Sequence, residues 1–142
     1  MIDRAEIGHR DRVLRAYFEG RYWDENEEFA LKRELVLKSH EIFPEYPFLI
    51  DSDWEVCPNM AQNGQGDFIF TDGMGSFAIV EVKWIDRLST GDTASARRTK
   101  KRKKVREQAA GYRDVWASRF PDAVKVEGYY FTNENRNTVV KI

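Results

Sequence analysis

Acidic and basic side chains stand at spacings that suit metal-assisted chemistry in the middle of the chain. Asp67 opens one apolar run, and Glu81 and Lys83 lie two positions apart in a second. Residues 72–75 between the runs read Asp-Gly-Met-Gly, and an Asp-Gly pair between apolar runs is a strong β-hairpin signal. A hairpin turning near its centre would bring Asp67 opposite Val80 or Glu81.

The expected hairpin would concentrate oxygen ligands at one point. Directly opposed residues have β-carbons about 4.5–5.5 Å apart, so Asp67 and Glu81 could share one hard cation. The carbonyl of Val82 is a further candidate ligand, and waters would complete a shell suited to Mg²⁺, with Mn²⁺ as a substitute. Such a cation polarises a phosphate, activates a water and stabilises a leaving oxygen. Lys83 shares the face of Glu81 and is placed to position or deprotonate the attacking water.

A purely structural interpretation competes with this one. Asp67 would then simply begin a strand, and Glu81 and Lys83 would form a surface ion pair. That interpretation leaves unexplained why two carboxylates oppose each other beside Gly64 and Gly66.

A third motif follows downstream, where Gln108 and Tyr112 stand four residues apart and share one helix face. The order Gly-Gln-Gly-Asp at 64–67, Glu-Val-Lys at 81–83, then Gln-x-x-x-Tyr resembles the PD-(D/E)xK nuclease superfamily. The likeness is to its RecB and lambda-exonuclease branch in particular, and it spans residues 64–131. It implies a restriction-endonuclease-like fold and Mg²⁺-dependent cleavage of nucleic acid, with catalytic residues Asp67, Glu81, Lys83, Gln108 and Tyr112 and metal ligands Asp67, Glu81 and Val82.

The resemblance leaves two points open. Many members of the superfamily have proline where Gly66 stands, although glycine is common in the Gly-x-x-Asp branch. Many also place a glutamate from an early helix beside the metal. The candidates here are Glu34, which is flanked by Leu31 and Leu35, and Glu41 near the end of the same predicted helix.

Hydrophobic periodicity predicts an α/β fold with a small mixed sheet flanked by helices, in the order ααβββαβ. A single domain over 1–142 is expected, with N-terminal helices in 1–43 and the core in 48–131. The predicted helices are 9–19, 24–43 with Asp24 as N-cap, and 96–119, whose residues Val105, Ala109, Tyr112 and Trp116 share one face. The predicted strands are 48–56, in which apolar and acidic residues alternate, 67–71, 76–84 and 124–131, with a loop at 58–66. The apolar end at 139–142 could add one more strand after a turn at 133–137.

A basic run occupies residues 97–106, where eight of ten residues are basic and none is acidic. The rest of the chain then holds 15 basic against 24 acidic residues. Such segregation predicts contact with phosphates, although a solvated helix face or a nuclear-import signal remains an alternative. The predicted nucleic-acid-binding residues are Arg97, Arg98, Lys100, Lys101, Arg102, Lys103, Lys104 and Arg106.

The composition narrows the class of protein. Cys57 is the only cysteine and His9 and His40 are the only histidines, which argues against disulfides, structural zinc and iron–sulfur clusters. No apolar stretch approaches the ~20 residues that span a bilayer, and 1–6 lack an apolar signal core. A cytoplasmic location is expected, or a nuclear one in a eukaryotic source, with no membrane partner.

These features favour a Mg²⁺-dependent nuclease acting on nucleic acid, with DNA as the favoured substrate. One alternative keeps the fold but cleaves branched or specific DNA, as a Holliday-junction-resolvase-like or restriction endonuclease does. Symmetric substrates of that kind usually require a homodimer or a larger complex. Another alternative is a non-catalytic nucleic-acid-binding module of the same fold.

Overall fold

The computed structural model describes residues 2–56, 64–88 and 90–142. The helices are α1 (Arg4–Gly20), α2 (Glu27–Ile42) and α3 (Asp92–Arg119), and the strands are β1 (Phe48–Glu55), β2 (Gln65–Thr71), β3 (Ser76–Lys83), β4 (Lys125–Thr132) and β5 (Asn135–Lys141). Cys57 and most of the loop predicted at 58–66 lie outside the described residues.

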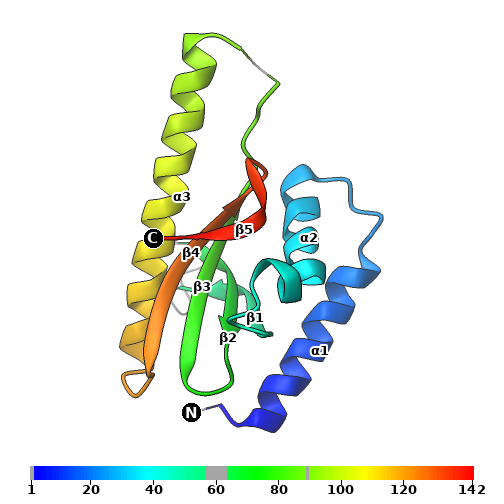
Figure 1. The fold of residues 1–142 in the computed structure, drawn as a ribbon, viewed down its shortest axis with the longest axis vertical. Coiled ribbons are helices and arrows are strands. Elements are labelled where there is room, and N and C mark those ends of the chain that lie inside the picture. Colours follow the sequence, from blue (N-terminus) through cyan, green and yellow to red (C-terminus); the bar gives the residue numbers. More distant parts are fainter. Residues whose placement is uncertain (1, 57–63, 89) are drawn as a thin grey trace.

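The five strands form one mixed sheet in the order β1-β2-β3-β4-β5. Neighbouring strands are antiparallel except β3 and β4, which run parallel. Parallel neighbours need a long crossover, and α3 provides it, packing along β3 and β4 (Figure 1). The prediction of a mixed α/β architecture is therefore confirmed.

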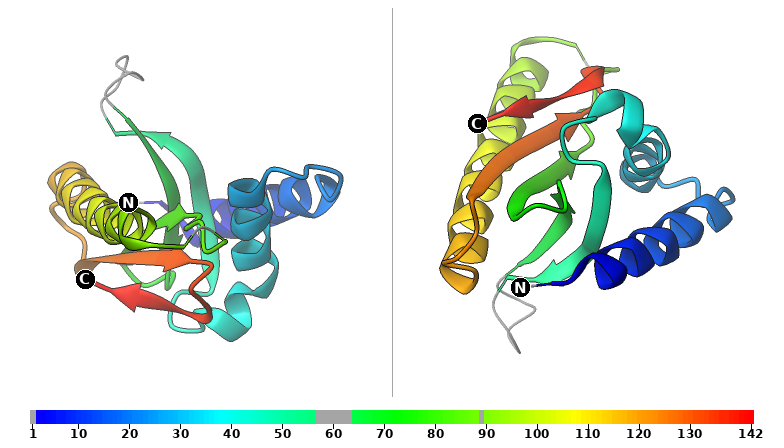
Figure 2. Two further views of the ribbon diagram at one scale, coloured as in Figure 1. Left: turned by 90° about the horizontal axis from the view of Figure 1, so that it is seen from above. Right: turned by 60° about the horizontal axis from the view of Figure 1, so that its bottom comes forward.

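Helices cover both faces of the sheet, so the fold has three layers (Figure 2). The core on the α2 side is built around Leu35, Phe68 and Phe131, and the core on the α3 side around Ile69, Ile79 and Trp116. Helix α1 packs along the edge strand β1. Alternate residues of β2 and β3 enter opposite cores, which explains why both strands are almost wholly buried.

The N-terminal helices differ in their starts from the sequence prediction. α1 begins at Arg4 because the side chain of Asp3 caps it, accepting a hydrogen bond from the amide of Glu6 at 2.9 Å. The prediction of Asp24 as the cap of α2 is wrong. Asn26 takes that place and accepts from the amide of Phe29 at 2.9 Å, whereas Asp24 lies before the helix and binds Arg21.

The C-terminal part also departs from expectation. α3 begins at Asp92, after Gly91 with φ of 98°, and not at 96. The turn predicted over 133–137 is shorter, because β5 already begins at Asn135 and pairs with β4. The order is therefore ααβββαββ. Predicted alternation in the first strand breaks at a register shift between Leu49 and Asp51, so Leu49 and Ile50 are both buried.

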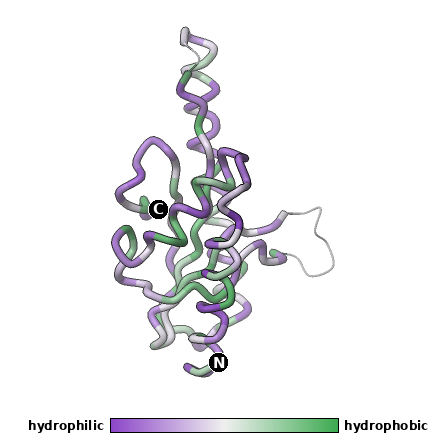
Figure 3. Tube along the Cα trace, turned by 90° about the vertical axis from the view of Figure 1, so that its right-hand side faces the viewer, coloured by the Kyte–Doolittle hydropathy of each residue, from purple (hydrophilic) through white to green (hydrophobic). Residues whose placement is uncertain are grey.

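Figure 3 shows the N-terminal end of α3 projecting beyond the rest of the chain. Within the part of the chain that the structure describes, no helix is long and apolar enough to cross a membrane.

Candidate metal and nucleic-acid site

The hairpin of β2 and β3 sets the register that the candidate site depends on. Asp72 stabilises its turn, where one side-chain oxygen accepts from the amides of Met74 at 2.7 Å and Ser76 at 3.0 Å. Backbone pairing runs from Thr71–Phe77 to Phe68–Val80. Continued by one residue, this register places Asp67 opposite Glu81, the second of the two predicted partners.

Beyond this pairing, two carboxylates join the strands. The amide of Asp67 donates to Oε2 of Glu81 at 2.7 Å, and the amide of Val82 donates to Oδ2 of Asp67 at 2.7 Å. Each carboxylate therefore binds the opposite strand. The predicted meeting of Asp67 and Glu81 is present, and both side chains are held by backbone amides that fix their positions.

Burial gives this pair unusual proton affinity. Glu81 is only 4% exposed. Burial, followed by the negative charge of Asp67, raises the pKa of Glu81 to about 9. Burial also raises the pKa of Asp67, against the attraction of Lys32 and the hydrogen bond from Val82. A cation bound beside these two carboxylates would stabilise their ionised forms, which burial and mutual repulsion disfavour.

Lys32 of α2 is the ammonium that contacts this pair. Its Nζ lies 2.9 Å from Oδ1 of Asp67, and both side chains are less than a fifth exposed. Burial alone would lower the pKa of Lys32, but Asp67, followed by Asp53 and Glu28, outweighs it and raises the pKa. Sequence reasoning missed Lys32.

Lys83, the predicted catalytic lysine, has a different partner. Its Nζ lies 3.6 Å from Oε1 of Glu28, in the first turn of α2, and the same oxygen accepts from the amide of Trp84 at 3.4 Å. The side chain of Lys83 is 39% exposed. A groove of about 350 Å³ opens here, lined by Asn26, Glu27, Glu28, Lys83, Trp84 and Lys101.

The early-helix glutamate that pairs with Lys83 is Glu28. Its charge contributes to the raised pKa of Asp67. Glu34 instead forms ion pairs with Lys38 and Arg136, and Glu41 is exposed. Helical spacing could have revealed this, because Glu28 lies three and seven positions before buried Leu31 and Leu35, on their face of the helix.

Tyr112 reaches the site from α3, on the other side of the sheet. Its pKa is raised by burial, followed by the charges of Glu81 and Asp67. A β-carbon on Gly64, whose φ is 116°, would lie 2.6 Å from the Tyr112 hydroxyl. The shared face of Val105, Ala109, Tyr112 and Trp116 is confirmed as inward-facing. Gln108 is half-buried one turn before Tyr112.

Gly66 has a packing reason to be glycine. A β-carbon at this position would overlap the indole of Trp54, which crosses the backbone there. Trp54 in turn packs edge-on against Tyr112, with ring centroids 6.0 Å apart. Proline also carries a β-carbon, so the same overlap disfavours proline at this position.

The basic run lies on the N-terminal half of α3, on the same helix as Gln108. Arg102 is bound to Glu134, its Nε and Nη2 each at 2.6 Å from a carboxylate oxygen, and Arg87 binds Glu134 as well. Arg98 is half-exposed, and the other six predicted residues are exposed: Arg97, Lys100, Lys101, Lys103, Lys104 and Arg106. Lys101 also lines the groove with Lys83, so the run adjoins the predicted catalytic lysine.

The donor set fits a hard divalent cation. Carboxylate oxygens from Asp67 and Glu81 are the ligands that Mg²⁺ and Mn²⁺ prefer. Among residues 2–56, 64–88 and 90–142, no group of three or more acidic, histidine or cysteine side chains is arranged to hold a metal. Further ligands would come from the Val82 carbonyl, water or substrate oxygens, as is common for Mg²⁺ sites.

Comparison of the chain with protein-family models, with curated proteins and with solved structures found no match. The chemistry of the site itself must therefore carry any assignment of function.

Proposed function

We propose that this chain is a Mg²⁺-dependent nuclease of the PD-(D/E)xK type, which hydrolyses phosphodiester bonds of nucleic acid and acts on DNA. The observation that carries the proposal is the reciprocal pair of hydrogen bonds between Asp67 and the strand of Glu81. It holds the buried carboxylate of Glu81 and the half-buried carboxylate of Asp67 together at the end of the hairpin. The mixed sheet between helices is compatible with the restriction-endonuclease-like core that the three motifs imply.

In this proposal Asp67 and Glu81 hold the metal, and the Val82 carbonyl adds a ligand. The cation would neutralise charge on the scissile phosphate and favour deprotonation of the attacking water. Lys83 lies at the adjoining groove, where Glu28 fixes its ammonium for contact with a phosphate oxygen or the attacking water. Tyr112 and Gln108 would orient the site from α3.

The basic run would guide the phosphate backbone to this groove. Six of its eight side chains are exposed, and Lys101 lies at the groove wall. Lys and Arg side chains in such a track bind phosphates without regard to sequence. The arrangement therefore supports a backbone-tracking nuclease whose sequence preference, if any, comes from other residues.

One observation favours a second candidate. Lys32 already pairs with Asp67, so a permanent ammonium in the place of a metal would make the chain a non-catalytic nucleic-acid-binding module of the same fold. Metal binding separates the two candidates, since only the nuclease requires it.

The direct test is an incubation of the purified chain with linear, circular, single-stranded and branched DNA and with RNA, with and without Mg²⁺ or Mn²⁺. Metal-dependent products that disappear in Asp67→Asn are expected. Products from branched DNA alone would instead support a structure-selective endonuclease. Nucleic-acid binding without cleavage or Mn²⁺ affinity would establish the non-catalytic module.

A further inference from the structure

Both oxygens of the Asp67 carboxylate are engaged. Oδ2 accepts from the amide of Val82, and Oδ1 binds the ammonium of Lys32 at 2.9 Å. The first contact satisfies the backbone amide of Val82, which is buried in the hairpin and would otherwise lack an acceptor. The second is made by a flexible side chain from another element, so Oδ1 is the oxygen that can change partners.

Lys32 is positioned to serve this carboxylate. It stands between Leu31 and Leu35, which are 1% and 0% exposed, so the helix turn that carries it is anchored in the core. The side chain of Lys32 is itself 18% exposed. A long cationic side chain is rarely buried to this degree unless it is paired. The pairing with Asp67 supplies the reason.

We propose that Lys32 is the resident counter-ion of the metal site, and that a divalent cation binds by displacing its ammonium from Oδ1 of Asp67. This inference rests on the proposed function, because it assumes that Asp67 is a metal ligand. It makes the ammonium and the metal alternative occupants of one carboxylate. In the metal-free protein Lys32 neutralises Asp67, and in the metal-bound protein the divalent cation does so.

The displaced ammonium has other acidic partners within the site. Asp53 and Glu28 both attract Lys32, in addition to Asp67. Glu28 stands one helical turn before Lys32 on α2, a spacing at which side chains meet. Lys32 can therefore leave Asp67 while remaining in the site, where its positive charge would be available to a bound phosphate.

Calorimetric titration with Mn²⁺ tests the inference on the full chain. Lys32→Met removes the competing charge while keeping a long side chain, and it should bind Mn²⁺ at least about tenfold more tightly than the parent, which corresponds to ~1.4 kcal/mol. Lys32→Arg keeps the charge and should stay close to the parent. Lys38→Met is the matched control, since Lys38 is on the same helix but pairs with Glu34.

A second measurement needs no variant. The side-chain amine of Lys32 can be followed by nuclear magnetic resonance while the parent is titrated with diamagnetic Mg²⁺. Its resonance should move as the metal saturates the site, because the partner on Oδ1 is lost. This arm remains decisive if Lys32→Met does not fold.

The outcomes distinguish a failure of the Lys32 counter-ion role from a failure of the proposed nuclease function. A parent that binds no divalent metal overturns both. A parent that binds metal, with Lys32→Met equal or weaker in affinity, or with a Lys32 resonance unmoved at saturation, overturns the counter-ion role alone and leaves the nuclease proposal standing.

Discussion

The amide nitrogen of Asp67 lies 2.7 Å from Oε2 of Glu81, so the acidic side chain of one strand binds the backbone of the other. The two residues thus have a structural role in addition to the metal-binding role that we propose for them. Alanine at either position would remove a hydrogen-bond acceptor from a buried amide, which costs ~1–3 kcal/mol. Substitution by asparagine or glutamine keeps an acceptor oxygen, so it tests metal binding separately from the structural role.

Asp67→Asn and Glu81→Gln should therefore keep the fold and lose metal-dependent cleavage. Each retains a side-chain oxygen for the backbone amide but removes a negative ligand. Mn²⁺ calorimetry should show binding in the parent and its loss in both variants. Glu34→Gln, on α2 but paired with Arg136, is the control and should bind like the parent. Parent-like Mn²⁺ affinity in both variants would eliminate the site.

Lys83→Ala should slow cleavage while leaving Mn²⁺ affinity close to that of the parent. An ammonium is not a metal ligand, and loss of a general acid or base typically costs ~10²–10⁴-fold in rate. Stability should change little, because the ion pair with Glu28 is partly exposed. Single-turnover cleavage rates measure the effect. The control Lys38→Ala breaks a comparable ion pair with Glu34 and should cleave at the parent rate. If Lys83→Ala also cleaves at the parent rate, Lys83 has no catalytic role.

Replacing Lys100, Lys101, Lys103 and Lys104 by glutamine should weaken binding to all DNA sequences alike and flatten its salt dependence. Each duplex phosphate contact contributes a slope near −0.9 in log K against log salt, and about −0.7 for single strands. Arg102 is left in place because it holds Glu134. Anisotropy titrations at several salt concentrations measure the slope.

The control for the basic run is the double variant Lys38→Gln and Lys125→Gln, which removes charge away from α3. It should retain the parent slope. If the fourfold variant also retains it, the exposed run is a solvated face or an import signal and not the track of the substrate.

Gly66→Ala should destabilise the protein by ~1–3 kcal/mol, the usual cost of forcing an extra group into a packed core. The added β-carbon would overlap the indole of Trp54. Urea unfolding measures the change. Gly20→Ala is the control, because nothing lies within 4 Å of its added carbon. Equal midpoints for the two variants would mean that Trp54 moves aside without cost.

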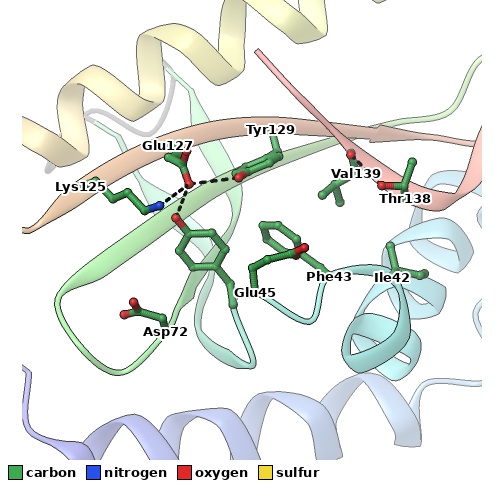
Figure 4. Close-up of a pocket in the computed structure, with 10 residues that line it drawn as sticks. Ile42, Phe43, Glu45, Asp72, Lys125, Glu127, Tyr129, Thr138 and Val139 are labelled. Carbon is green, nitrogen blue, oxygen red and sulfur yellow. Dashed lines mark hydrogen bonds and ion pairs between the residues drawn. The ribbon is translucent and has the colours of Figure 1, made fainter.

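The stability of the protein should fall in acid because of Glu127, which lines a pocket of about 350 Å³ (Figure 4). Burial would raise the pKa of Glu127, but hydrogen bonds from Lys141, Tyr46 and Tyr129 outweigh it and lower the pKa to about 2. A carboxylate with a lowered folded-state pKa contributes stability above its unfolded pKa, near 4.5, and loses it as pH falls towards 2.

Urea unfolding between pH 7 and pH 2 tests this contribution. Glu127→Gln should be less stable than the parent at pH 7 and should show a shallower loss below pH 4.5. Glu107→Gln changes an exposed carboxylate 4.0 Å from Lys103 and should follow the parent curve. If the free energy of unfolding falls equally with pH in the parent and in Glu127→Gln, groups other than Glu127 cause the loss of stability in acid.

The sequence predicted those features that depend on local rules. Two apolar runs and the Asp-Gly signal between them specified the hairpin, and the resulting register brought Asp67 to Glu81. The stripe of Val105, Ala109 and Trp116 specified the inner face of α3. These features were predictable because neighbours in sequence determine them.

Features that depend on tertiary contacts were missed. Nothing local distinguishes Lys32 from other helical lysines, since its partner Asp67 is brought to it by the sheet. Asp24 instead pairs with Arg21 and accepts from the amide of Asn26, and Asn26 caps α2. The final strand was expected only at 139–142, and its start at Asn135 was missed because residues 135–137 are polar and exposed and are ordered by pairing with β4.

The length of α3 has a consequence for its basic half. Its 28 residues extend ~42 Å at ~1.5 Å per residue, against ~26 Å for the eight residues of β3. Before Ala109, only Ala94 and Val105 in this helix are buried. Segments with so few apolar contacts open locally at low free energy. Phosphates bound along this end would suppress its opening and slow amide hydrogen exchange there, so helix order and the proposed capture of substrate would form one coupled equilibrium.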